Sequence, residues 1–308
     1  MDAYERVVRV LDFEEPDRVP IFDVIMNTKI YETFGGLGDP LEVAAKTFRR
    51  LGIDAVRHYL DPGRHWLVEW YDDFFRYLRV KRDGWVIETT RDDARHQMTW
   101  ISRRPFGDLE GLEGYMPSFP DKEEIADDYV EAFRKAYKAF WPHTLLIGES
   151  TLCFVDAFHF MGLRLFCRAL HTAPHVVRRL MDVFTEYNAA YAELFAENDF
   201  GPLFFIGDDI AYKHGLIAPL DFLRKEWIPR LKRAMRPLKR RGIKVLFHSD
   251  GNIWRILDDL IDAGIDALNP LEPNAGMDVA RVKEKYGDRI ALFGGVNSAG
   301  VLQFGSPE

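Results

Sequence analysis

Short apolar runs rich in β-branched and aromatic residues recur along the chain, and longer amphipathic stretches separate the later ones. The runs expected to form strands are Val19–Ile25, Ala55–Leu60, Thr144–Gly148, Leu203–Gly207, Lys244–His248, Ala267–Leu271 and Arg289–Phe293. Helical spacing of apolar residues predicts helices at Asp221–Lys239, Ile253–Ala263 and Asp278–Tyr286. Apolar strands that alternate with helices are typical of a parallel sheet covered on both faces. Seven predicted strands favour an α/β fold of the (β/α)8 TIM-barrel type over an open sheet.

One segment, 62–120, interrupts the alternation after the second strand. It is rich in aromatic residues, and Asp83-Gly84 is a hairpin signal between two alternating runs, Arg76–Arg82 and Trp85–Thr90. We therefore expect an aromatic-rich insertion on the mouth side of the barrel. It would serve either as a substrate-facing lid or as cover for a layer of helices.

The last residues, Gly305-Ser306-Pro307-Glu308, have the pattern of a helix start, with a Ser N-cap and Pro in the first turn. That helix would follow strand seven, and an eighth strand would come later. Because an unclosed parallel barrel leaves two unpaired strand edges, we expect the chain to be truncated before strand eight. Residues 1–308 are expected to form a single domain.

Composition restricts the function. The 308 residues are 47% hydrophobic, and the formal charge of -8 with no long basic run argues against nucleic-acid binding. The charged N-terminus is unlike a signal peptide, and no apolar run is long enough to cross a membrane, so we expect a cytoplasmic protein. Cys153 and Cys167 lack metal-ligand spacing and are expected to be buried thiols.

Polar side chains follow almost every predicted strand. In a parallel barrel the active site lies at the carboxyl ends of the strands, so these residues are the candidates for chemistry. Beside Asp23, Arg57 and Asp61, they are Asn27, His58, Glu149, Asp208, Asp209, His248, Asp250, Asn269, Glu272 and Asn297. A purely structural barrel does not need such a set, because buried acids are costly unless they are paired or bind a metal.

His248 and Asp250 form the strongest element of this set. Residues two apart on an extended strand point the same way, so both side chains would face the mouth. An imidazole and a carboxylate that converge there suit half of a zinc site or a general acid/base pair. The alternative is a His that is hydrogen-bonded to a loop Asp and only fixes the turn at Gly251.

The other candidates also have two interpretations each. Asp208 and Asp209 are adjacent, so only one of the two can enter the mouth, and both are catalytic candidates. Glu149 is a candidate metal or substrate ligand by position, or else a helix cap. Substrate-binding roles are expected for Asn269, Glu272, His58, Asn27 and Asn297, which could instead satisfy loop groups or be structural.

Several motifs together resemble the uroporphyrinogen decarboxylase superfamily. They are Glu14–Pro20, Gly207–Ile210, Pro219–Phe222, Val245–Asn252, Leu268–Pro273 and Ala291–Asn297. The resemblance covers nearly the whole chain and implies the barrel independently of the strand count. It also implies one of two chemistries: decarboxylation of a tetrapyrrole, or zinc-dependent methyl transfer to or from a corrinoid cofactor.

The two branches of that superfamily differ at two motifs. The decarboxylases carry arginines just after the first strand, whereas no Arg occurs here between Arg18 and Arg49. The methyltransferases place a His-x-Cys pair at the end of strand five, where this chain has His248 and then Asp250 in the position of the thiolate. A carboxylate still suits zinc, and the change fits a methyl-donor enzyme better than a thiol acceptor.

The resemblance therefore implies a methyltransferase, an O-demethylase component. It would act on a small methylated compound, for which the aromatic insertion suggests a methoxylated aromatic, and its partner would be a corrinoid protein. His248, Asp250 and Glu149 would bind zinc. Tetrapyrrole decarboxylation and a non-catalytic ligand-binding barrel are the alternatives, and the oligomeric state stays open, although dimers are common among such barrels.

Overall fold

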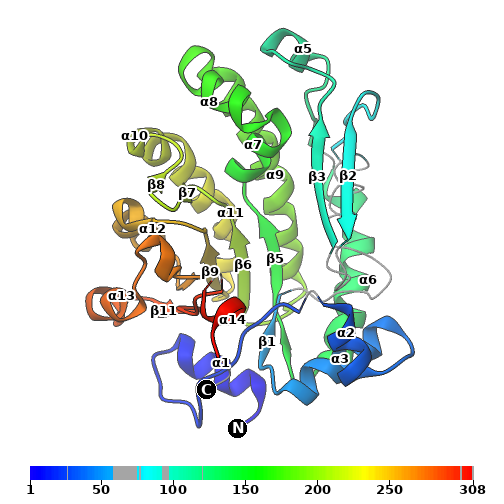
Figure 1. Cartoon of the computed structure of the whole chain (residues 1–308), viewed down its shortest axis with the longest axis vertical. Helices are drawn as coiled ribbons and strands as arrows, with labels where there is room; N and C mark the ends of the chain where they lie inside the picture. The colour runs from blue at the N-terminus through cyan, green and yellow to red at the C-terminus, as the bar shows by residue number, and fades with distance from the viewer. Residues whose placement is uncertain are drawn as a thin grey trace.

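A parallel sheet of five strands runs through the computed structural model (Figure 1), which describes residues 1–25, 27–57, 75, 78–91, 97–119, 121–298 and 300–306. The strand order is β11-β10-β9-β6-β5. The strands are β5 (Gly148–Thr151), β6 (Leu203–Gly207), β9 (Lys244–His248), β10 (Ala267–Asn269) and β11 (Ala291–Leu292). β6 and β9 match their predicted ranges, and β10 and β11 are shorter than predicted. β5 begins at the last residue of the run predicted as a strand, Thr144–Gly148, and extends beyond it.

A second parallel pair, β1 (Ala55–Val56) with β4 (Leu145–Leu146), extends this arrangement, because a single residue separates β4 from β5. The strand expected at Val19–Ile25 does not form. That segment contributes one isolated bridge from Phe22 to Ala55. Backbone hydrogen bonds join Ile21 and Asp23 to residues 54 and 55, but the Asp54 side chain accepts the Ile21 N–H at 2.8 Å, and the pairing extends no further.

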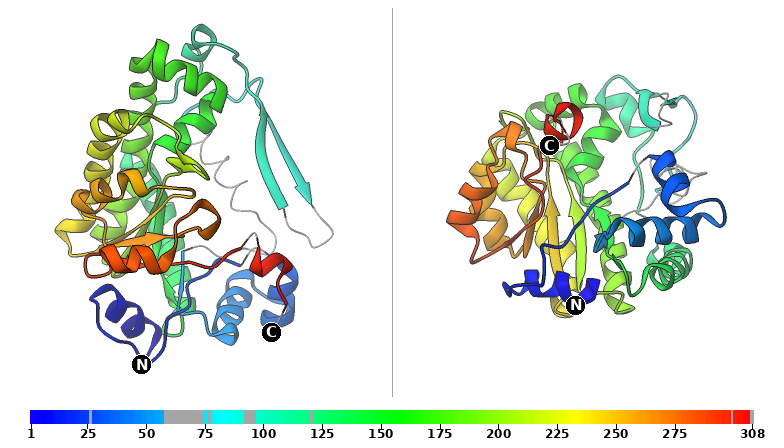
Figure 2. Two further views of the ribbon diagram at one scale, coloured as in Figure 1. Left: turned by 60° about the vertical axis from the view of Figure 1, so that its left-hand side comes forward. Right: turned by 60° about the horizontal axis from the view of Figure 1, so that its bottom comes forward.

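The inner face of these strands is lined by a separate apolar cluster. Phe205, Leu246, Ala267 and Ala291 lie side by side on adjacent strands. Helix α1 (Ala3–Leu11) covers the N-terminal end of the strands, burying its apolar stripe, which includes Val7 and Leu11, in the same cluster. Figure 2 shows α1 at one end of the molecule, away from the carboxyl ends of the strands.

Helices cover the outer face of the sheet (Figures 1 and 2), and most of the core lies between them and the strands. In chain order these elements and the short ones between them are α2 (Thr28–Ile30), η1 (Tyr31–Gly35), α3 (Pro40–Leu51), α6 (Lys122–Phe140), α7 (Phe154–Met161), α8 (Leu163–Thr172), α9 (Pro174–Glu197), β7 (Ala211–Tyr212), β8 (Gly215–Leu216), α10 (Leu220–Phe222), η2 (Leu223–Trp227), α11 (Ile228–Arg240), η3 (Trp254–Ile256), α12 (Leu257–Ala263), η4 (Pro273–Ala275), α13 (Val279–Tyr286) and α14 (Val301–Phe304). The three predicted helices correspond to α10–α11, η3–α12 and α13, and α12 ends at Gly264 with φ +107°, as a glycine stop signal predicts.

The described part of segment 62–120 contains an antiparallel hairpin, β2 (Val86–Arg91) with β3 (Gln97–Arg103), and a short helix, α5 (Leu109–Glu113). The prediction that Arg76–Arg82 pairs with Trp85–Thr90 is wrong, because the second run pairs with β3 instead. Gly84 does adopt a left-handed conformation (φ +83°), but its turn precedes β2 and packs against Pro105. Figure 1 shows the hairpin and α5 toward the same end of the molecule as α7 and α8, which follow the carboxyl end of β5.

The strands do not form a closed barrel by hydrogen bonds within the described residues. Phe22 and Phe293, from the first and last parts of the strand array, are in edge-to-face contact with ring centroids 5.6 Å apart. The helix expected to begin at Ser306 falls largely on residues that the structure does not describe, and Ser306 itself follows the end of α14. No helix in the described ranges combines the length and the apolar character that a membrane span needs.

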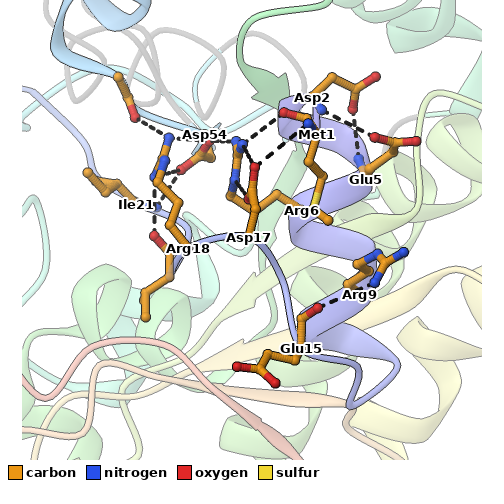
Figure 3. A network of polar contacts seen from close by, with 12 residues as sticks. Met1, Asp2, Glu5, Arg6, Arg9, Glu15, Asp17, Arg18, Ile21 and Asp54 are labelled. Atoms are coloured by element: carbon orange, nitrogen blue, oxygen red, sulfur yellow. Dashed lines mark hydrogen bonds and ion pairs between the residues drawn. The ribbon is translucent and has the colours of Figure 1, made fainter.

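A network of alternating charges lies at the N-terminal end of the strands (Figure 3). Arg6 of α1 donates to both Asp17, at 2.6 and 2.8 Å, and Asp54, at 2.6 Å. Arg18 donates to the same Asp54 carboxylate at 2.7 and 2.9 Å. The hydrogen bond to Arg6 holds the pKa of Asp17 well below its usual range. The network joins α1, the Glu14–Pro20 motif and the start of β1, which gives that motif a structural role.

Candidate functional site

The His248 imidazole lies at the carboxyl end of β9 and faces two carboxylates. Its Nε2 is 3.7 Å from an oxygen of Asp209 and 3.6 Å from an oxygen of Asp250. One potential ligand atom from each residue lies within 4.8 Å of the other two. A nitrogen and two carboxylate oxygens at this separation fit a divalent cation such as zinc, because each atom would have to move only a short way to reach it.

The orientation of His248 is fixed from the other side of the ring. Its Nδ1 is 2.6 Å from Oδ1 of Asn269, which lies beside it on β10. The Asn269 amide nitrogen donates to the Phe293 carbonyl at 3.1 Å, so Oδ1 is the acceptor that faces the ring. Nδ1 therefore carries a hydrogen that it donates to Asn269, and Nε2, on the carboxylate side of the ring, is the nitrogen that could ligate a metal. A metal-binding histidine needs this tautomer.

The backbone after β9 turns sharply and holds the carboxylates in place. The Asp250 N–H donates to Asp209 at 2.9 Å, and the Gly251 N–H donates to Glu272 at 2.7 Å. Gly251 has φ +83°, and a Cβ there would lie 2.6 Å from the backbone of Tyr212, so only glycine fits this turn. The turn thus orients the carboxylates of Asp209 and Glu272 through its N–H groups, and the close approach of Tyr212 requires glycine at 251.

Negative charge is concentrated at this end of the sheet. Burial raises the pKa of Asp250, the neighbouring Asp209 and Glu272 raise it further, and His248 and Arg57 lower it. Two carboxylates this close repel each other unless a proton or a cation lies between them. The cluster therefore has the electrostatics of a cation site.

The structure separates the two adjacent acids, Asp208 and Asp209. Asp208 is 1% exposed, and its carboxylate accepts the backbone N–H groups of Cys153, Phe154 and Val155 at 2.6–3.1 Å. It also accepts the indole N–H of Trp227 at 2.7 Å. Burial raises the pKa of Asp208 to about 7, whereas the donors favour its ionised form. Asp208 therefore caps the N-terminus of α7 and does not face His248.

Glu149, expected as a metal ligand, is paired with another group. Its Oε2 accepts a hydrogen bond from Nη1 of Arg57 at 2.5 Å, and Asp209 takes the place that Glu149 was expected to fill beside His248 and Asp250. The Arg57 guanidinium lies 4.4 Å from the centroid of the Phe205 ring. That ring is in turn 5.3 Å from the imidazole of His248. The Phe205 ring thus lies between Arg57 and His248 and contacts both.

Asn27 and Asn297 do not join the cluster. Asn27 caps α2 by accepting the Lys29 N–H at 2.9 Å, and Asn297 pairs with Asn274 through two amide hydrogen bonds. His58 lies outside the described residues. Both cysteines are free thiols; Cys153 is buried and Cys167 is half-buried.

The place of Asp209 in the candidate metal cluster and the contacts of Arg57 were not expected from the sequence. For Asp209, the available signal was that neighbouring residues on a strand point to opposite sides. That rule predicts that one acid of the pair reaches the mouth, but it does not say which.

Comparison with known proteins places this geometry in a family. The family model described as uroporphyrinogen decarboxylase (URO-D) matches residues 96–308, which is more than half of the chain. The chain belongs to the uroporphyrinogen decarboxylase family. The match includes β5–β11 and every member of the Asp209–His248–Asp250 cluster, and it confirms the resemblance that the sequence motifs indicated.

A solved structure gives the same fold. The chain is similar to a methyltransferase from Methanosarcina mazei, with a TM-score of 0.65 over 95% of this chain and 82% of the other. At 19% sequence identity this likeness concerns the fold alone. No protein in the curated set matches the sequence significantly. The fold is thus that of the decarboxylase superfamily, mixed α/β with a parallel sheet.

Proposed function

We propose that this member of the uroporphyrinogen decarboxylase family is a zinc-dependent methyltransferase that works with a corrinoid protein. The observation that carries the proposal is the convergence of Asp209, His248 and Asp250, with His248 held in the metal-binding tautomer by Asn269. The methyltransferase fold of the structural neighbour supports it as an analogy.

The three residues would hold zinc, and the metal would polarise the oxygen that carries the methyl group. Since all three ligands are nitrogen or oxygen, the site is harder than one built with thiolates, and we propose an O-methyl compound, such as a methoxylated aromatic, as the donor. When the methyl group leaves, the oxygen needs a proton. Glu272 lies beside the cluster, since its carboxylate accepts the Gly251 N–H, and we propose that it passes this proton from solvent to the oxygen.

The decarboxylase alternative has less support at this site. A tetrapyrrole with several carboxylates needs several cationic partners. Arg18 is committed to Asp54 at the opposite end of the strands, and the single guanidinium of Arg57 would not serve several carboxylates. The carboxylate-rich cluster would repel the remaining ones.

Metal content and methyl transfer test the proposal together. We expect about one zinc per chain in the wild-type protein. We expect a loss of zinc, and of methyl transfer from 3-methoxybenzoate to cob(I)alamin, in Asp209→Asn, His248→Ala and Asp250→Asn. His171→Ala, which changes an exposed histidine on α8, is the matched control and should keep both.

A metal-free wild-type protein with methyl transfer unchanged by His248→Ala would contradict the proposal. Release of CO2 from uroporphyrinogen would favour the decarboxylase instead. Thermal stabilisation by 3-methoxybenzoate without turnover would favour the binding barrel.

A further inference from the structure

The position of Arg57 suggests a role beyond its ion pair. The side chain follows β1 and is 23% exposed, so it reaches the carboxyl end of the strands while remaining largely packed. Its guanidinium lies over the Phe205 ring, and that ring also contacts His248. Arg57 and the candidate metal cluster therefore border the same region.

The guanidinium is held in place but is not saturated with partners. Arginine has five N–H donors, and within the described residues Arg57 uses Nη1 for one hydrogen bond, to Glu149. Stacking on Phe205 fixes the plane of the group, so it loses little conformational freedom when it binds a further acceptor. A planar carboxylate is the acceptor that best matches such a group.

The charges around Arg57 strengthen this argument. Asp209, Asp250 and Glu272 make the region acidic, and an anionic substrate could bind there only with a specific cationic anchor. The Phe205 ring, which contacts both Arg57 and His248, places the positive charge of Arg57 beside this cluster.

We infer that Arg57 binds a carboxylate of the methyl-bearing substrate, so that the substrate class is a methoxylated aromatic acid. This inference rests on the proposed function for the identity of the reaction, but the binding step can be tested alone. The carboxylate would lie on Arg57 while the methoxy group faces Asp209, His248 and Asp250. Glu149 would orient the guanidinium and leave its other donors for the ligand.

The test compares 3-methoxybenzoate with its neutral isostere 3-methoxybenzamide by isothermal titration calorimetry, with no methyl acceptor present. A charge-assisted hydrogen bond predicts that the wild-type protein binds the acid about 10- to 100-fold more tightly than the amide. Arg57→Gln should remove this preference and leave amide binding unchanged, and Arg57→Lys should restore part of it. Arg255→Gln, an exposed arginine on η3 with the same change of charge, is the control and should keep the preference.

Equal binding of acid and amide by the wild-type protein, or binding of neither, would overturn the inference even if methyl transfer were intact. The same conclusion would follow if Arg57→Gln weakened the binding of the acid and of the amide by the same factor. If Arg57→Gln does not fold, the affinities of the wild-type protein and of Arg57→Lys for the acid and the amide still test the inference. Tight acid binding without zinc or methyl transfer would instead contradict the proposed function and leave the Arg57 site standing.

Discussion

The two ends of the parallel strands carry charged clusters of opposite character. At the N-terminal end, both Asp17 and Asp54 accept hydrogen bonds from guanidinium groups at 2.6–2.9 Å. At the carboxyl end, Asp209 and Asp250 share one imidazole, whose Nε2 is 3.7 and 3.6 Å away. In the first network each carboxylate is paired with a guanidinium, whereas in the second two carboxylates face one imidazole.

This difference separates a structural cluster from a functional one. A buried carboxylate with two guanidinium partners holds chain segments together and has little capacity to bind anything else. Like charges that face one another without a cation cost stability, unless a ligand offsets the repulsion. The balance of charge, more than the number of charged residues, therefore indicates which end of the strands binds a ligand.

The largest expected effect is on stability, at the N-terminal end. Arg6→Ala should lower the free energy of unfolding by about 2–3 kcal/mol, because it leaves the buried Asp54 with Arg18 alone. Urea denaturation would measure it, and zinc content should not change. Arg9→Ala, on the exposed side of the same helix, should cost less than about 0.5 kcal/mol. Equal effects of the two substitutions would mean that the network does not stabilise the fold.

The fold could be predicted where the local pattern and the tertiary structure agree. The runs 203–207 and 244–248 are buried on both faces and were predicted at their observed bounds. Val19–Ile25 has equally strong strand character, but its backbone is held by the Asp54 side chain, a partner far along the chain. The hairpin partner of Trp85–Thr90 was missed for a similar reason, since two neighbouring segments competed for it and only the tertiary structure selects one.

The candidate site could be predicted as residue types but not as partners. Strand-end position indicated His248, Asp250 and the Asp208–Asp209 pair. Asp208 points into the core because its carboxylate accepts hydrogen bonds from Trp227 and from the N-terminus of α7, and this leaves Asp209 to face His248. The local sequence does not reveal these partners. Glu149 was a candidate metal ligand by its position at a strand end, and its ion pair was missed because Arg57 is distant in sequence.

A smaller effect is expected from removing the residue that orients His248. Asn269→Leu keeps the two carboxylates and the imidazole of the cluster but removes the acceptor for the Nδ1–H of His248. It should therefore weaken zinc binding by about 10- to 100-fold. Asn269→Asp supplies an acceptor again and should restore part of the affinity. Competition with a chromophoric chelator would measure both. Unchanged affinity in Asn269→Leu would show that the tautomer of His248 is not set by this contact.

The smallest expected effect is on the stability of the metal-free protein. The pKa of Asp250 is raised in the folded state, so its stabilising contribution is complete below the unfolded value of about 4 and is lost as pH rises through the folded pKa. Asp250→Asn removes this titration. Because the side chain is 56% exposed, the gain relative to wild type at pH 7 should be only a few tenths of a kcal/mol.

Added zinc should reverse the sign of this difference, because the wild-type site gains binding energy that Asp250→Asn lacks. Thermal melts from pH 4 to 8, with EDTA and with zinc, would show both effects. Asp288→Asn, at an exposed position after α13, should show neither. If Asp250→Asn were less stable than wild type even in EDTA, Asp250 would be satisfied by its own surroundings. The carboxyl-end cluster would then resemble the network around Asp54, and the contrast between the two ends of the strands would no longer point to a ligand.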